Sequence, residues 1–371
     1  MKYSYCMIVR HVFLLIVILN WRVCLGQESR RLLHVGITLP LTGPAAAYGM
    51  AARNGFELAR KHNLGIRNHL FFNYEDTQLK PALAVNAFSS LQQRHKNAIH
   101  FDFGSATSLA LAPIAEQRRV LLVSSAYDSA VSRNRDFVYR FTNSTADYAA
   151  VMASELRRRG VREVAVVVAD NPFFTEFADT LKAAMADYEQ FAIHLVKADE
   201  SDFGAVALKL RNGNSSLRGL GIFLFVEQAS QLLRKMNATG IVGFMFATDA
   251  LEEITPQHPD AQLFEGIQFP NAKVTSEFIE MYRNDYGTIA HSTFAASTYD
   301  FANMLEQVFR QCQLCGSEEL QKALEAPLAR HGALGEYRFI NSPEAGKHFA
   351  SDIVMKAVLP RDAITRAASM K

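Results

Sequence analysis

The sequence predicts an α/β protein of two lobes, each built around a parallel sheet that helices cover on both faces. The chain has 371 residues, more than one hydrophobic core usually organises, and 49% of them are hydrophobic. Short apolar runs alternate with amphipathic stretches of helical period, and this alternation breaks once near residue 140 before it restarts. We therefore expect two Rossmann-like, doubly wound lobes joined by a hinge of several strands.

The individual elements follow from this alternation. The expected strands are short runs rich in Val, Ile, Leu and Phe, at residues 32–39, 69–75, 98–103, 120–124, 163–169, 192–196, 221–226 and 243–247. The expected helices lie between or after them, at residues 50–62, 81–94, 108–118, 146–159, 173–186, 203–211 and 228–238.

Two changes in the pattern suggest where the chain passes between lobes. A break at residues 138–142 precedes a polar segment in which Ser144 can cap the next helix. After residue 247 three helices are expected at 275–286, 293–311 and 317–328, followed by strands at 337–340 and 353–358. We expect the N-terminal lobe to comprise 27–142 and 250–328, and the C-terminal lobe 143–249 and 329–371.

The first 26 residues are typical of a secretory signal. Lys2 and Arg10 precede an apolar core at residues 12–19, and small residues at the end of the segment predict cleavage after Gly26. A retained membrane anchor or a lipoprotein attached at Cys24 is an alternative. We expect an exported, periplasmic protein.

Net charge argues against several kinds of partner. Removing the three basic residues of segment 1–26 from the 39 of the chain leaves 36 basic against 37 acidic residues, a net charge of −1. Nothing in this balance predicts binding to nucleic acid or to anionic lipid.

The mature chain keeps two cysteines, Cys312 and Cys315. In an oxidising compartment they are expected to form a disulfide in a short loop between two helices. A redox-active pair is the alternative. We expect no metal site, because one pair of cysteines without a paired His motif is poor support for zinc.

Loops at the carboxyl ends of parallel strands usually hold the ligand in such folds. The loop at residues 40–49 lacks the G-x-G-x-x-G spacing of dinucleotide sites. The loop at 104–108 offers the hydroxyls of Ser105 and Thr107 and the N–H groups of a helix start, which together suit a carboxylate. Capping of that helix by Ser105 or Thr107 explains the pattern equally well. The loop at 124–129 is expected to complete the site or to form an ordinary polar turn.

Known catalytic motifs do not occur in this chain. The sequence contains no G-x-S-x-G elbow, no H-E-x-x-H helix and no Walker loop, and its histidines lack the spacing of metal ligands. The sequence therefore predicts no enzyme and no cofactor.

Five segments, in order along the chain, resemble the leucine/isoleucine/valine-binding protein family of ABC-transporter substrate receptors. These segments read LPLTGPAAAYG, GSATSLALAPIAE, LLVSSAYDSAVS, VVVADNPFFTEFADTLKAAM and STYDFANMLEQV. The resemblance covers nearly the whole mature chain and implies the type I periplasmic binding protein fold.

The resemblance also implies roles for residues of the N-terminal lobe. Tyr48 matches the aromatic side chain that closes over the ligand from the first loop. Ser105 matches the hydroxyl that meets the ligand carboxylate, with help from the backbone of Tyr127 and Asp128. The family's usual Thr stands at the position of Asp128.

In the C-terminal lobe, Phe174 stands where the family has Tyr, and Phe225 or Val226 matches another aromatic of the cleft. Asp249 matches the acid that pairs with the ligand's ammonium group, although it can instead cap a helix beginning near residue 251. Residues 225–227 replace a small, glycine-rich turn. This departure and Asp128 both alter charge and volume next to the ligand, so the resemblance leaves open whether the ligand is a branched-chain amino acid.

The expected function is that of a monomeric receptor that captures a small amino acid, carboxylate or amide by hinge closure and delivers it to an ABC transporter permease. A sensory module that reports a metabolite to a membrane partner is one alternative. An exported α/β enzyme is another.

Overall fold

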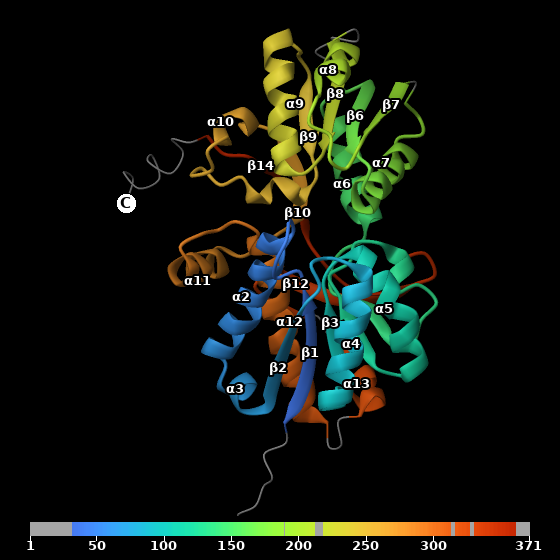
Figure 1. Cartoon of the computed structure of the whole chain (residues 1–371), viewed down its shortest axis with the longest axis vertical. Coiled ribbons are helices and arrows are strands. Elements are labelled where there is room, and N and C mark those ends of the chain that lie inside the picture. The colour runs from blue at the N-terminus through green and yellow to red at the C-terminus, as the bar shows by residue number, and fades with distance from the viewer. Residues whose placement is uncertain (1–31, 189, 212–217, 313–315, 327–329, 361–371) are drawn as a thin grey trace, which may run out of the picture.

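The computed structural model describes residues 32–188, 190–211, 218–312, 316–326 and 330–360. These residues form two lobes, each with its own sheet (Figure 1). We call the lower lobe of Figure 1, which begins with the N-terminal strands, the first lobe, and the upper one the second lobe. The expected signal segment, residues 1–26, lies outside the described residues.

An eight-stranded sheet forms the centre of the first lobe, in the order β11-β12-β13-β5-β4-β3-β1-β2. Neighbours from β2 to β13 are parallel, whereas β13, β12 and β11 pair antiparallel. Its strands are β1 (Leu33–Leu39), β2 (Leu70–Asp76), β3 (Ile99–Asp102), β4 (Leu121–Ser124), β5 (Val138–Arg140), β11 (Arg330–Gly332), β12 (Gly335–Ser342) and β13 (Gly346–Ser351).

A six-stranded sheet forms the centre of the second lobe, in the order β14-β10-β9-β8-β6-β7. All neighbours are parallel except β10 and β14. Its strands are β6 (Glu163–Ala169), β7 (Gln190–Val196), β8 (Arg218–Phe223), β9 (Phe244–Ala247), β10 (Gln268–Ala272) and β14 (Ile353–Ala357).

Helices cover both faces of the first sheet. In β4, Leu121 and Val123 belong to one hydrophobic core and Leu122 to another, because successive residues of a strand point to opposite faces. The first core includes residues of α2 and α12, and the second includes residues of α4 and α5. The helices of this lobe are α2 (Ala46–His62), α3 (Leu64–His69), α4 (Pro81–His95), α5 (Ser105–Arg118), the 3₁₀ helix η1 (Ser129–Val131), α11 (Ser276–Tyr286), α12 (Ser292–Gln311) and α13 (Ser317–Leu324).

The second lobe repeats this arrangement with helices between consecutive strands. Its first helix begins after Ser144, whose hydroxyl accepts a hydrogen bond from the Asp147 N–H while the Asp147 carboxylate accepts one from the Ser144 N–H. The helices are α6 (Thr145–Arg158), α7 (Pro172–Ala184), α8 (Gly204–Arg211), α9 (Val226–Thr239), the 3₁₀ helix η2 (Asp249–Glu253) and α10 (Ala261–Phe264). The two-lobed α/β fold with parallel sheets is confirmed.

Within the described residues, the chain passes between the lobes three times, after β5, after β10 and after β13. The assignment of segments to lobes differs from the expected one in two places. Residues 250–272 stay with the second lobe, because β10 pairs with β9 and β14. Residues 330–351 belong to the first lobe, because β13 pairs with β5. The expected boundaries between 249 and 250 and between 328 and 329 are therefore corrected. The second lobe continues to residue 272, and the first lobe continues to residue 351.

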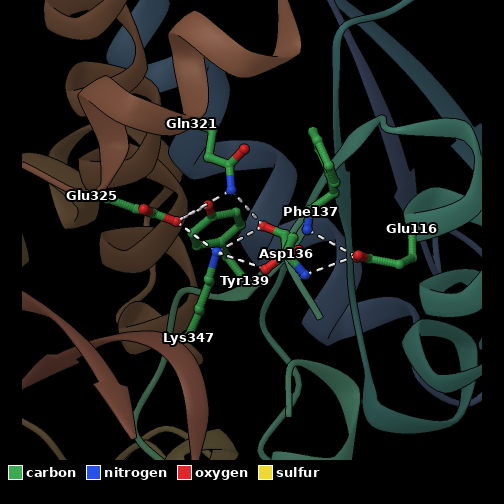
Figure 2. Close-up of polar contacts among 7 residues, drawn as sticks. All are labelled: Glu116, Asp136, Phe137, Tyr139, Gln321, Glu325 and Lys347. Carbon is green, nitrogen blue, oxygen red and sulfur yellow. Dashed lines mark hydrogen bonds and ion pairs between the residues drawn. The ribbon is translucent and has the colours of Figure 1, made fainter. Parts of the chain in front are cut away.

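A polar cluster around the buried Lys347 holds β13 on the first sheet (Figure 2). Lys347 of β13 donates to a Glu325 carboxylate oxygen at 2.7 Å and to the Asp136 carbonyl at 3.0 Å. The Tyr139 hydroxyl of β5 also donates to Glu325, at 2.5 Å. Glu116 of α5 accepts hydrogen bonds from the backbone N–H groups of Asp136 and the next residue. The cluster therefore ties α5, β5, β13 and the end of α13 together.

Cys312 follows α12 and is disulfide-bonded. Its expected partner, Cys315, lies outside the described residues, so the pairing stays a prediction. Across the described ranges, no helix has both the length and the apolar character needed to cross a membrane.

Candidate functional site

A cavity lies between the two lobes, beside the loops that follow strands of both sheets. About 790 Å³ of it is free of protein atoms, and part of this space is open to solvent. Such loops are where ligands bind in open parallel sheets. The residues that line it are Ala45, Tyr48, Leu79, Phe103, Gly104, Ser105, Ala106, Ser125, Tyr127, Asn171, Pro172, Phe173, Phe174, Phe225, Asp249, Ala250 and Phe294.

The first turn of α5 forms part of the wall on the first-lobe side. Gly104 precedes it with φ +101, a conformation that side-chain-bearing residues rarely adopt, and a Cβ there would meet Leu79 at 2.5 Å. Ser105 and Ala106 then line the cavity at the start of the helix. Because the first N–H groups of a helix have no partner within it, this end supplies hydrogen-bond donors.

Ser125 adds a buried hydroxyl to the same wall. Its side chain is only 5% exposed, and its oxygen has no hydrogen-bond partner among the described residues. Its backbone N–H donates to the Asp102 carbonyl, which fixes the loop after β4 next to the loop after β3. A buried polar group without a partner is costly, so a ligand that contacts this hydroxyl would gain a ready hydrogen bond.

Two residues expected in the site, Thr107 and Asp128, do not line the cavity. Thr107 is buried, and its hydroxyl lies 2.8 Å from two acceptors, the Asp102 carboxylate and the Phe103 carbonyl. The Asp128 carboxylate accepts from the Ala130 N–H at 2.7 Å and so caps η1. The Asp128 backbone N–H donates to the Ser105 hydroxyl at 3.3 Å, so it contacts the wall through that serine.

Aromatic side chains form the wall on the second-lobe side. Phe173 and Phe174 begin α7, with ring centroids 5.1 Å apart, and Phe225 packs edge-on against Phe174 at 5.0 Å. Asn171 caps α7 through the Phe173 N–H, which sets the direction in which the helix starts. This wall gives a ligand a large apolar surface.

Asp249 brings a carboxylate into the cavity from the second lobe. It is 7% exposed, and burial raises its pKa to about 7. Thr248, rather than Asp249, caps η2, by accepting a hydrogen bond from the Ala250 N–H. The Asp249 carboxylate accepts a hydrogen bond from the Tyr127 hydroxyl of the first lobe. One side chain from each lobe therefore meets across the cavity.

Tyr48 lines the cavity from the first turns of α2. Its ring lies 4.3 Å from that of His291 and 5.7 Å from that of Phe294, measured between centroids. Burial, together with the charges of Glu253, Asp249 and Glu252, raises the pKa of Tyr48 well above its usual value. The electrostatic potential around this ring is therefore negative.

A second contact between the lobes lies beside the cavity. Glu252 of η2 accepts hydrogen bonds from the Ser292 hydroxyl at 3.0 Å and from the Thr293 N–H at 2.9 Å, at the N-terminus of α12. Lys356 lies 3.5 Å from the same carboxylate. Burial opposes ionisation of Glu252, but the charge of Lys356 and the bonds from Thr293 outweigh it and lower its pKa.

Six of the eight residues expected to bind ligand line one cavity: Tyr48, Ser105, Tyr127, Phe174, Phe225 and Asp249. The sequence prediction missed Ser125, although it lies in a loop already singled out. It also missed Phe294, which lies in a long helix far along the chain and has no local signal. Among the described residues, no group of three or more His, Cys, Asp or Glu side chains is arranged to hold a metal ion.

The sequence matches a known protein family and a known bacterial binding protein. Residues 33–352 match the family model described as periplasmic binding protein. The Leu/Ile/Val-binding protein homolog 3 of Brucella melitensis is 24% identical over 251 residues, which cover 64% of this chain and 67% of that protein.

Solved structures of similar proteins have the same fold. The leucine-binding protein LivK of Thermotoga maritima superposes with a TM-score of 0.78 at 20% identity, over 89% of this chain and 96% of that one. The substrate-binding protein LivJ of Streptococcus pneumoniae, solved with isoleucine, gives 0.77 at 18%, over 89% and 97%. A solute-binding protein of Rhodopseudomonas palustris, solved with 3,4-dihydroxybenzoic acid, gives 0.74 at 15%, over 88% and 92%.

Proposed function

The chain belongs to the periplasmic binding protein family, and from this premise we propose that it is a receptor that captures a small polar molecule by hinge closure and delivers it to an ABC transporter. Its fold is the type I periplasmic binding protein fold, as the sequence predicts. The ligand has the size and polarity of an amino acid or of a related carboxylate or amide. Capture takes place in the periplasm, and the protein acts without catalysing a reaction.

The observation that carries this proposal is a cavity whose walls come from both lobes and meet through the Tyr127–Asp249 hydrogen bond. A ligand held between these walls contacts both lobes at once, so it favours the closed arrangement over any arrangement with the lobes apart. Closing the lobes excludes water from the cleft, and polar groups there then count for more than they do in water.

Relatives support a small ligand with a compact apolar part. One similar solved protein holds isoleucine and another holds 3,4-dihydroxybenzoic acid. The apolar surface of Phe173, Phe174 and Phe225 suits side chains or rings of that size.

A thermal-shift screen of the purified mature protein against amino acids, amides, amines and aromatic acids tests the proposal. We expect at least one compound to raise the melting temperature, to bind in calorimetry, and to reduce the radius of gyration in X-ray scattering. The double variant Ser105→Ala/Asp249→Ala should lose the thermal shift. If no compound binds and scattering never changes, the receptor function is wrong.

A further inference from the structure

A carboxyl group is buried just behind the first-lobe wall of the cavity. Asp102, the last residue of β3, has no exposed surface. One carboxylate oxygen accepts a hydrogen bond from the Thr38 hydroxyl at 2.5 Å. The other accepts from the Thr107 hydroxyl at 2.8 Å and the Ser108 hydroxyl at 2.7 Å. Burial raises the pKa of Asp102 to about 6, although these three donors favour its charged form, so the acid is ionised at pH 8.

This carboxylate changes what the start of α5 can attract. Thr107 and Ser108 lie in the first turns of α5, where the helix dipole is positive. With Asp102 bonded to both of them, the positive end already faces an anion of the protein itself. The two hydroxyls also point away from the cavity, which leaves Ser105, Ser125 and the helix N–H groups as uncharged donors.

The second-lobe side adds negative charge as well. Asp249 lines the cavity, and no Lys, Arg or His belongs to its lining as far as the described residues go. Lys356, the cation near η2, is paired with Glu252 at 3.5 Å. The carboxylate of Asp249 therefore lines the cavity, and that of Asp102 lies behind its first-lobe wall.

Arg140 is a buried cation behind the Tyr127 loop, but it does not line the cavity. Its guanidinium donates to the carbonyls of Tyr127 and Ala345 at 3.2 and 2.9 Å. The charges of acidic side chains act on it in turn, namely those of Asp147, Glu176 and Asp128. The positive charge of Arg140 is thus compensated by these acids and does not contact a ligand in the cavity.

From this charge arrangement we infer that the cavity discriminates against anions and takes an amine or an amide. The ligand's N–H groups face Asp249, its neutral acceptor meets Ser105 and Ser125, and its apolar part packs on the phenylalanine wall. The inference rests on the proposed receptor function and narrows its ligand class. A carboxylate bound at the start of α5 would lie near Asp102, and buried like charges repel strongly.

A ligand series on matched scaffolds tests the inference in the wild-type protein. The compounds are 3-phenylpropanoate, 3-phenylpropanamide, phenylalanine and phenylalaninamide, with 4-methylpentanoate and 4-methylpentanamide as the aliphatic pair. Calorimetry at pH 8 should give each amide a Kd at least about tenfold lower than that of its matched carboxylate. A carboxylate that binds as tightly as its amide overturns the inference.

The variant Asp102→Asn tests the origin of the preference. Removing the charge should raise the affinity for the carboxylate, relative to that for the matched amide, about tenfold. A purely structural role for Asp102 would weaken both ligands alike and leave this ratio unchanged. The matched control is Asp300→Asn, since Asp300 is 1% exposed and bonded to the N–H groups of Ala333 and Leu334, away from the cavity. Its ratio should equal that of the wild type.

The two proposals fail in different ways. If the wider screen identifies an anionic ligand, the charge inference is wrong and the receptor function stands. If no solute of any charge binds, both are wrong.

Discussion

The carboxylate of Asp249 is buried in the cavity, where it accepts a hydrogen bond from the Tyr127 hydroxyl. Burial raises its pKa to about 7 from an ordinary value of 3.8. The folded protein therefore holds a proton on this group that the unfolded chain has released between about pH 4 and pH 7. In that interval the stability contributed by Asp249 falls as the pH rises.

Asp249→Asn should therefore raise the stability of the ligand-free protein at pH 8 and leave it unchanged at pH 4. We expect a gain of about 1–3 kcal/mol in the free energy of unfolding at pH 8, because the amide avoids the cost of burying a charge. Urea unfolding of both proteins at the two pH values measures this. Equal stability at pH 8 would mean that Asp249 is ionised without cost in the cavity.

Residue positions in the site were predictable where the signal is local. Ser105 and Tyr48 lie in loops that follow strands, and both line the cavity. Thr107 does not line the cavity, and sequence spacing does not tell which hydroxyl of a helical turn points inward. That choice depends on Asp102, a buried acceptor whose position only the packed sheet defines.

Close packing of two helices is the main contact on one face of the first sheet. Gly55 of α2 faces α12, and a Cβ at Gly55 would lie 2.1 Å from the Ala295 carbonyl oxygen. Backbone atoms cannot move aside as a flexible side chain can.

Gly55→Ala should therefore destabilise the protein, although alanine is the better helix former. We expect a loss of about 1–3 kcal/mol in the free energy of unfolding, as in other overpacked cores. The control is Gly204→Ala in α8, where the Cβ would meet only the Asp202 side chain at 3.2 Å. Denaturant unfolding should leave the control within about 0.5 kcal/mol of the wild type.

The Lys347 cluster offers a test of how β13 is held (Figure 2). Lys347→Met should cost about 1–3 kcal/mol, because it leaves Glu325 without its cation and the Asp136 carbonyl without one of its donors. The control, Glu318→Gln, removes the exposed ion pair between Glu318 on α13 and Arg119 at the end of α5. It should cost less than about 1 kcal/mol. Thermal unfolding measures both effects. The same fall in melting temperature for the two variants would argue against a stabilising role for the cluster.

Elements with long periodic patterns were predicted well, and the short ones were not. The strand β5 has three residues, so it read as a break in the pattern. The strand β10 contains Pro270 two residues into its span and follows Gly266, both typical of loops. It forms because β9 and β14 flank it, and β14 lies more than eighty residues further along the chain.

At the scale of the whole molecule, closure depends on contacts that join the lobes. Glu252 reaches from the second lobe to the N-terminus of α12 in the first. Glu252→Ala should weaken ligand binding about three- to tenfold, because less of the protein occupies the closed arrangement. Glu265→Ala is the control, since it removes an exposed acid of the second lobe that lies outside the cavity lining.

X-ray scattering and calorimetry together check this prediction. The Glu252→Ala protein without ligand should have a larger radius of gyration than the wild type, and saturating ligand should remove the difference. Weaker binding with an unchanged radius of gyration would mean that Glu252 acts on the site without affecting closure.

The division into two lobes was predictable because each lobe repeats the strand–helix alternation. The path of the chain after residue 247 was not, since pairing of β13 with β5 joins strands separated by two hundred residues. Nothing near either strand encodes that partner. It follows from the whole first sheet, whose edge at β5 is open until β13 arrives.

This late pairing sets the order in which the molecule can be finished. A nascent chain that has been synthesised through β10 has every strand of the second sheet except β14, while the first sheet still ends at β5. The unpaired N–H and C=O groups of β5, at the open edge of the first sheet, form a template for association with other chains. Translation products that stop before β13 should therefore aggregate, and the C-terminal residues protect the solubility of the N-terminal ones.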